Sequence, residues 1–135
     1  MNAITPYLGF DGNCNEAMTF YASCLGADLQ VMRFADAPGD IPPEAKDRVM
    51  HARLSKGPAV LMASDGMPGM PIHQGNNYSV SVHCDSREEI ERVFAAFAAK
   101  GTVTMPLGDQ FWGARFGMLT DQFGIQWMFN FELPK

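Results

Sequence analysis

The sequence predicts an α+β fold in which two βαβββ repeats form a curved, mostly antiparallel sheet cup with the helices on the outside. Two amphipathic helices with similar N-terminal signals begin 73 residues apart, after Asn13 and after Ser86. A strand candidate precedes each helix and three follow it. Because one repeat alone could not bury both its helix and its sheet faces, the two repeats are expected to share a core.

Each predicted helix has a start signal and a stop signal. Asn13 with Glu16, and Ser86 with Glu89, have the spacing of a capping box. Gly26 is expected to end the first helix as a left-handed cap, and residues 100–101, Lys-Gly, to end the second. Apolar residues recur at helical spacing in both segments: Ala17, Phe20, Tyr21, Cys24 and Leu25, then Ile90, Val93, Phe94, Phe97 and Ala98.

The strands and loops follow from alternation and from glycine and proline content. The expected strands are residues 4–10, 28–34, 48–55 and 59–64, then 77–83, 102–107, 114–120 and 125–131. Residues 35–47 and 66–77 are rich in proline and glycine and are predicted to be loops, the first of them an ordinary mobile loop, a lid or a dimer arm. Residues 1–135 are therefore read as one domain, with a first repeat over about 1–66, a linker over 66–76 and a second repeat over 77–135.

The most informative stretch is the predicted hairpin over residues 118–130. Asp121 opens its turn and Gly124 closes it. The strand that follows alternates between two faces. One face is apolar, with Ile125, Trp127, Phe129 and Phe131, and the other carries Gln126, Met128 and Asn130, as the wall of a cavity does.

Composition excludes several classes of function. The formal charge is −5 and the ten Lys and Arg residues are scattered, so a nucleic-acid surface is not expected. No apolar run approaches the roughly 20 residues that span a bilayer, and the first ten residues lack the pattern of a signal peptide. Three cysteines without a CxxC pair indicate reduced thiols and a cytoplasmic protein.

Short motifs along nearly the whole chain resemble the PhnB-like branch of the vicinal-oxygen-chelate superfamily, which includes glyoxalase I, extradiol dioxygenases and bleomycin-resistance proteins. The matching segments are Pro6-Tyr7-Leu8, His51-Ala52, Leu61 to Asp65, Phe111-Trp112-Gly113 and Phe123 to Met128. The resemblance implies a homodimer and a cup that holds a metal ion at its floor. This branch has also carried a demethylubiquinone methyltransferase label, which we discount because no Gly-rich loop lies between a strand and a helix.

The resemblance places the four metal ligands of the superfamily near Pro6, His51, Ser79 and Met128. Only His51 is an ordinary ligand, since proline has no side-chain donor, serine binds metals poorly and a thioether prefers Cu(I). One imidazole does not make a catalytic metal site, which usually needs three protein ligands. We therefore expect no metal and no other cofactor.

The cup itself is expected to bind a ligand. Ser79, Ser81 and His83 alternate with Val80, Val82 and Cys84, which leaves a polar face for the cavity. The candidate ligand-binding residues are His51, Arg53, Ser79, Ser81, Trp112, Arg115, Gln126 and Met128. Three alternatives stay open: these groups satisfy one another around water, Arg115 forms a structural ion pair, and Trp112 packs in the core.

Three functions follow. The first is a PhnB-like protein that binds a small polar or anionic molecule, with no assigned reaction and no known catalytic residues. The second is a metal-dependent isomerase, lyase or resistance enzyme of the vicinal-oxygen-chelate type. The third is a structural or partner-binding dimer with a vestigial cup.

Overall fold

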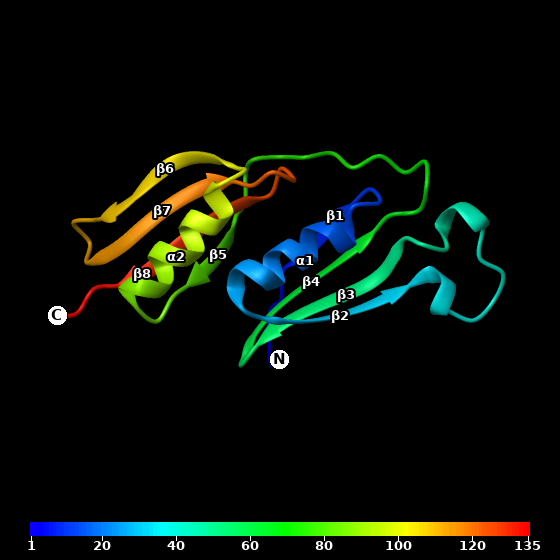
Figure 1. Ribbon diagram of the computed structural model, residues 1–135, viewed down its shortest axis with the longest axis horizontal. Coiled ribbons are helices and arrows are strands. Elements are labelled where there is room, and N and C mark those ends of the chain that lie inside the picture. The colour runs from blue at the N-terminus through cyan, green and yellow to red at the C-terminus, as the bar shows by residue number, and fades with distance from the viewer. The chain divides into compact units, whose positions relative to one another are not determined.

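Each half of the chain folds into a unit of one helix and four strands, as a computed structural model that describes residues 1–135 shows (Figure 1). The first unit is Met1–His73 and the second is Gln74–Lys135. No helix of either unit is both long enough and apolar enough to cross a membrane.

The first unit contains a mixed sheet and one α-helix. Its elements are β1 (Tyr7–Phe10), α1 (Cys14–Leu25), β2 (Asp28–Arg33), β3 (Val49–Lys56) and β4 (Ala59–Asp65), with two short 3-10 turns, Phe34–Asp36 and Pro43–Ala45, in the predicted loop. The strand order is β1-β4-β3-β2. The β1–β4 pair is parallel and the other two pairs are antiparallel.

The second unit repeats this arrangement. Its elements are β5 (Val80–His83), α2 (Arg87–Ala98), β6 (Thr102–Asp109), β7 (Ala114–Thr120) and β8 (Gln126–Glu132). The order is β5-β8-β7-β6, again with one parallel pair, β5–β8. Two βαβββ repeats with mostly antiparallel, curved sheets are confirmed.

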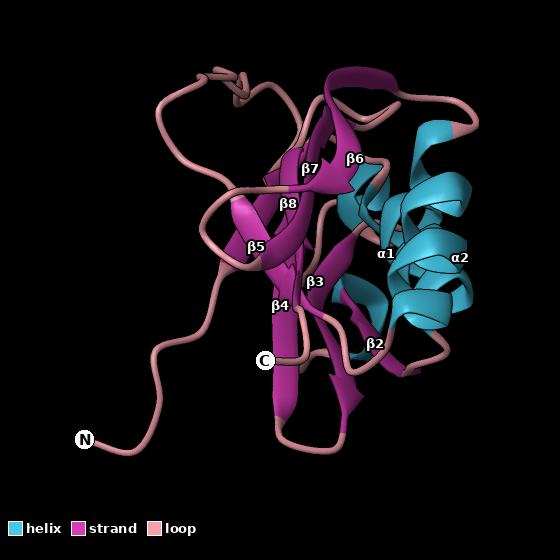
Figure 2. Cartoon of the chain, turned by 90° about the vertical axis from the view of Figure 1, so that its left-hand side faces the viewer, coloured by secondary structure: helices cyan, strands magenta, loops and turns pink.

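One helix covers one face of each sheet (Figure 2). In the first unit, the α1 side chains of Ala17, Met18 and Tyr21 are buried against Leu8, Leu54, Leu61 and other alternating strand residues. In the second, Phe97 of α2 packs on Trp127 and Phe129, with ring centroids 4.8 and 5.1 Å apart. Burial of apolar area on these two faces is the main stabilising contribution in each unit.

The helix starts differ from the prediction in one respect. Ser86 caps α2 as expected: its hydroxyl accepts from the Glu89 amide at 3.0 Å, and the Glu89 carboxylate accepts from the Asp85 amide. Asn13 stands at the N-cap of α1, but its side chain makes no capping bond. The predicted capping box is therefore wrong at α1.

Asp65 takes the place of that capping box. Its buried carboxylate accepts from the amides of Gly12 and Cys14 through Oδ1, and from Val49 through Oδ2. One side chain at the end of β4 thus satisfies the first amide of α1, the amide of Gly12 in the turn before it, and the first amide of β3. An unpaired amide at a buried helix start would be costly.

The chain reversals follow the prediction more closely. Gly26 adopts the left-handed conformation after α1 (φ 64°). The turn between β7 and β8 closes with a bond from the Gly124 amide to the Asp121 carbonyl, and Gly124 has φ 88°. The first strand of each unit is three residues shorter than predicted, in part because Pro6 has no amide with which to extend the β1–β4 ladder.

Two glutamines anchor the end of the linker to the second unit. Gln74 donates from Nε2 to the Phe123 carbonyl, and Gln126 donates from Nε2 to the Gly75 carbonyl, both at 2.9 Å. Residues 67–73 have no comparable side-chain anchor, and most of them are exposed.

Candidate functional site

The helix-free face of the first sheet carries polar side chains in register. Tyr7 on β1 lies opposite Met62 on β4, Met62 lies opposite Arg53 on β3, and Arg53 lies opposite Gln30 on β2. Paired residues project from the same face of a sheet, so these four side chains form one row across it. The residues between them, such as Leu8, Ala52 and Leu54, are buried on the helix side.

His51 lies beside this row and contacts Tyr7. The Tyr7 hydroxyl is 3.1 Å from His51 Nδ1, and the two rings stack with centroids 5.8 Å apart at 29°. The Tyr7 side chain therefore reaches across β4 to β3. Because Nδ1 is already paired, Nε2 is the ring nitrogen that remains for another partner.

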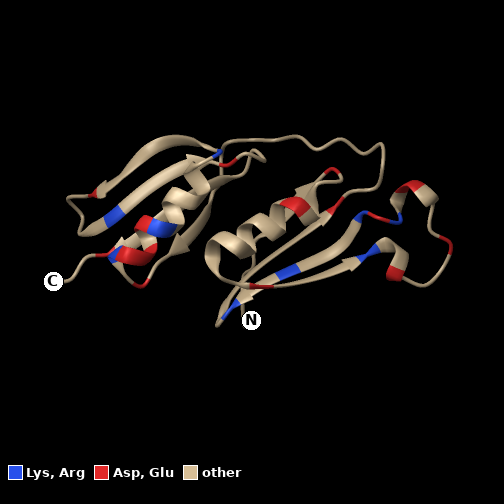
Figure 3. Cartoon of the chain, in the orientation of Figure 1, with Lys and Arg blue, Asp and Glu red and all other residues tan.

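Arg53 differs from most other arginines of the chain because its guanidinium has no hydrogen-bond or ion-pair partner. Arg33, Arg48, Arg87 and Arg115 each bond to a carboxylate or a carbonyl. Arg53 and Arg92 have no such partner, and Arg92 is exposed on α2 whereas Arg53 is half-buried. Lysines, arginines and acidic residues are otherwise interspersed over the elements (Figure 3).

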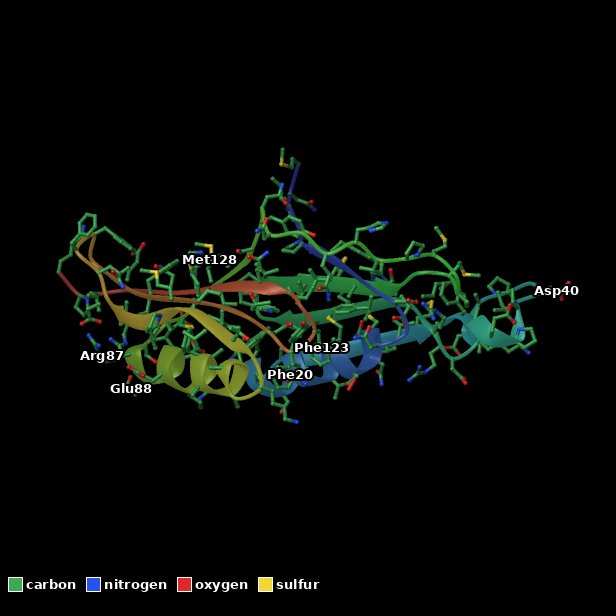
Figure 4. The ribbon with its side chains drawn as sticks, turned by 90° about the horizontal axis from the view of Figure 1, so that it is seen from above. Phe20, Asp40, Arg87, Glu88, Phe123 and Met128 are labelled. Atoms are coloured by element: carbon green, nitrogen blue, oxygen red, sulfur yellow. The ribbon has the colours of Figure 1, made fainter.

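The helix-free face of the second sheet is richer in sulfur. Ser81 on β5 lies opposite Met128 on β8, which lies opposite Met118 on β7. Figure 4 shows Met128 on the side of its sheet away from Arg87 and Glu88 of α2. Ser81 Oγ is 3.4 Å from His83 Nε2, and both residues are exposed.

Three further residues that the sequence selected lie in other positions. Ser79 precedes β5, and the amide of Gln126 is used to hold the linker at Gly75. Trp112 lies in the β6–β7 loop, half-exposed, with its ring 5.8 Å from Phe116. Its exposure rules out the alternative that Trp112 packs in the core.

Arg115 faces the other side of the second sheet. Its guanidinium bonds to Glu91 of α2 at 2.5 Å and to Asp109 of β6 at 2.9 Å. Hydrogen bonds from Arg115 and then Arg87 lower the pKa of the Asp109 carboxyl. The structure thus places Arg115 in an ion-pair network beside α2, away from the polar face with which the sequence grouped it.

Sequence reasoning did not select Tyr7 or Gln30. Both were visible by alternation, because Tyr7 precedes buried Leu8 and Gln30 falls between the inward-facing Leu29 and Val31. Their polar groups complete the row that contains Arg53. The structure brings His51 and Arg53 together on one face, and it brings Ser81 and Met128 together on another.

The metal implied by the superfamily does not fit these residues. Of the four inherited positions, Pro6, Ser79 and Met128 supply no nitrogen or carboxylate ligand. His51 Nδ1 is paired with Tyr7. No group of three His, Cys, Asp or Glu side chains is arranged to hold a metal ion.

Comparisons with known proteins identify the family. Residues 2–129 match the family model described as 3-demethylubiquinone-9 3-methyltransferase. The protein YjdN of Escherichia coli is 32% identical, over 94% of this chain and 93% of its own. The chain belongs to this PhnB-like family and has the glyoxalase-like fold.

Two solved structures show how close the similarity is. The protein PA1353 from Pseudomonas aeruginosa is 48% identical with a TM-score of 0.87, covering 97% of this chain and 98% of that chain. A putative 3-demethylubiquinone-9 3-methyltransferase, PhnB protein, from Bacillus cereus is 30% identical with a TM-score of 0.76, covering 95% and 98%. A glyoxalase/bleomycin resistance protein/dioxygenase family enzyme from Burkholderia phytofirmans, at 12% identity and a TM-score of 0.67 over 96% and 97%, shares the fold alone.

The family description names a methyltransferase, but this chain lacks the kind of turn at which a nucleoside-bearing methyl donor binds. Such cofactors bind at a glycine-rich turn between a parallel strand and a helix, on free helix-start amides. The β1–α1 turn has a single glycine, and the amides of Gly12 and Cys14 are already paired with Asp65. The residues present do not fit that group.

Proposed function

We propose that this PhnB-like protein binds a small polar or anionic molecule on the helix-free faces of its sheets, with no reaction assigned to it. The observation that carries the proposal is Arg53, a half-buried arginine with no hydrogen-bond or ion-pair partner, which lies in one row with Tyr7, Met62 and Gln30. A guanidinium in such a position costs free energy unless something pairs with it. A bound ligand group would supply that partner.

The residues that would contact the ligand are those on the helix-free faces of the two sheets. In the first unit these are His51 and Arg53, joined by Tyr7 and Gln30 from neighbouring strands. In the second unit they are Ser81 and Met128, with Trp112 beside Phe116 near the β6–β7 loop. Few polar groups on an otherwise apolar and sulfur-rich surface are typical of small-molecule sites.

A ligand screen tests the proposal directly. Uniformly 15N-labelled protein is titrated with a panel of small polar metabolites, both neutral and anionic, while backbone amide shifts are followed. We expect at least one compound to shift amides of β1, β3 and β4 and to raise the melting temperature, since binding to the native state alone stabilises it. A panel that leaves these amides and the melting temperature unchanged would contradict the proposal.

We also infer a homodimer. Each sheet has edge strands whose free backbone groups need a partner or cover. Two-fold pairing is the commonest closed arrangement of identical chains. Light scattering at micromolar concentration should report twice the mass of the 14.8 kDa chain, and a monomer would refute the inference.

A cytoplasmic location is the last part of the proposal. The three cysteines Cys14, Cys24 and Cys84 are all buried and unbonded. Free thiols are usual in a reducing compartment. Fractionation of cells that express the natural protein would test this, and recovery from an oxidising compartment would contradict it.

A further inference from the structure

We propose that Tyr7, His51 and Arg53 form an oxyanion site, specific for a ligand that carries a carboxylate or a phosphate group. The inference rests on the proposed function and narrows it, because it names the chemical group that the helix-free face of the first sheet recognises.

The first argument is charge. No carboxylate of the first unit forms an ion pair with Arg53. Asp28 lies on the same face of β2, diagonal to Arg53 and opposite Ser55, but it makes no salt bridge with Arg53. Asp11 pairs with Arg48, and Asp65 is buried under three backbone amides. Met62 and Gln30, the direct cross-strand neighbours of Arg53, are uncharged. The positive charge of Arg53 is therefore left for an anion, to which a guanidinium offers two parallel donors.

The second argument is the orientation of His51. When the Tyr7 hydroxyl donates to Nδ1 across the 3.1 Å contact, the ring proton resides on Nε2. His51 then presents an N–H donor two residues from Arg53 on the same face of β3. In this arrangement Tyr7 is a positioning residue, because a hydroxyl that donates to Nδ1 leaves the ring proton of His51 on Nε2.

The third argument is the balance of donors and acceptors. The guanidinium of Arg53 and the Nε2–H of His51 are donors, and the amide of Gln30 adds two more. The row itself contains no carboxylate, and Asp28, diagonal to Arg53, is the one carboxylate of β2 on this face. A single carboxylate beside a guanidinium is a poor site for a cation. A face with several donors and one fixed positive charge selects an oxyanion over a cation or a neutral amide.

The test uses three probes that share one ring. Benzoate carries a carboxylate, phenyl phosphate carries a phosphate, and benzamide is the neutral counterpart of benzoate. Each is titrated into the labelled full-length protein, following the amides of β3 and the Arg53 Nε–H signal. We expect at least one anion to bind and shift these signals, and benzamide to bind roughly tenfold to hundredfold more weakly. Which anion binds more tightly distinguishes a carboxylate ligand from a phosphate ligand.

Matched variants locate the site. Arg53→Gln removes the proposed cation, and Arg92→Gln removes the same charge from an exposed, unpaired position on α2. We expect Arg53→Gln to weaken the anion by about tenfold or more and Arg92→Gln to leave its affinity unchanged. Tyr7→Phe should weaken it by a smaller factor and should change the ring-nitrogen shifts of His51 that report the tautomer.

The outcomes separate the two levels of the proposal. Equal affinity for benzoate and benzamide overturns the oxyanion site and needs no variant to fold. Equal effects of Arg53→Gln and Arg92→Gln overturn it as well. If neutral compounds of the wider panel shift the same amides while the anions do not, the oxyanion site is wrong and small-molecule binding stands. If nothing shifts these amides, both are wrong.

Discussion

Trp127 donates from its indole Nε1 to Asp121 Oδ2 across 2.8 Å, and both residues are buried. The other carboxylate oxygen of Asp121 accepts from the amides of Phe123 and Ile125. One side chain therefore links the turn between β7 and β8 to the aromatic core under α2. Asp121, which begins the turn of the hairpin, therefore also accepts a hydrogen bond from Trp127 in the strand that follows.

Trp127→Phe should lower the free energy of unfolding by about 1–3 kcal/mol, because it removes the indole donor to the buried Asp121 carboxylate and leaves part of the core unfilled. Trp112→Phe is the control, since it makes the same change at a half-exposed position in a loop. That variant should stay within about 0.5 kcal/mol of the wild type. Urea denaturation measures both, and equal effects would show that the bond to Asp121 contributes nothing.

Ser86→Ala should cost about 0.5–2 kcal/mol, because the hydroxyl satisfies the Glu89 amide at the start of α2. Asn13→Ala should cost much less, because the Asn13 side chain makes no capping bond to α1. The two positions have the same sequence signature, so the pair isolates the bond itself. A larger loss for Asn13→Ala than for Ser86→Ala would contradict the observed caps.

Burial, and then the nearby charge of Asp65, raise the pKa of the Cys14 thiol from 9.0 to about 12. Between these values the unfolded chain loses this proton while the native protein keeps it, so stability falls as the pH rises. The wild type should therefore lose stability more steeply over this range than Cys14→Ala does. Denaturation at several alkaline pH values measures the difference, and parallel slopes would contradict the shifted pKa.

Protein purified without chelator should contain no stoichiometric zinc, nickel, manganese or iron, because only His51 of the four inherited positions is an ordinary ligand. His51→Ala should leave the metal content unchanged. It should cost about 0.5–1.5 kcal/mol, because its hydrogen bond to Tyr7 is exposed. Elemental analysis of the wild type and the variant measures the metal content. One equivalent of metal in the wild type that is lost in His51→Ala would favour a metal-dependent isomerase, lyase or resistance enzyme.

Most of the fold is predictable because it depends on local patterns. The caps near Ser86 and Gly26 and the alternation of Trp127 and Phe129 with Met128 are each written in adjacent residues. The role of Asp65 is not predictable in this way. Its three amide partners belong to residues 12, 14 and 49, so they are brought to it only when the unit has folded.

The site is predictable in part. His51 and Arg53 share a face because they are two residues apart on one strand, and this is a property of any strand. For Arg115 the sequence leaves both a ligand-binding role and a structural ion pair open, and the alternation along β7 favours the ion pair that the structure shows. Arg115 has the same parity as Leu119, which is buried, and as Gly117 on the helix side, so strict alternation would have assigned it to α2. The contact between Tyr7 and His51 joins two strands across a third, which sequence spacing does not reveal.

The two glutamine hydrogen bonds at the end of the linker also indicate where the chain can be cleaved or interrupted. Gln74 and Gln126 fasten the linker from residue 74 onward, whereas exposed Met67, Gly69 and Met70 have no side-chain anchor. Exposed, unanchored backbone is where chains accept insertions and where proteases cut. A break after Met70 would give two fragments that each keep a complete βαβββ unit, which makes this segment a natural position for a split reporter or an inserted tag.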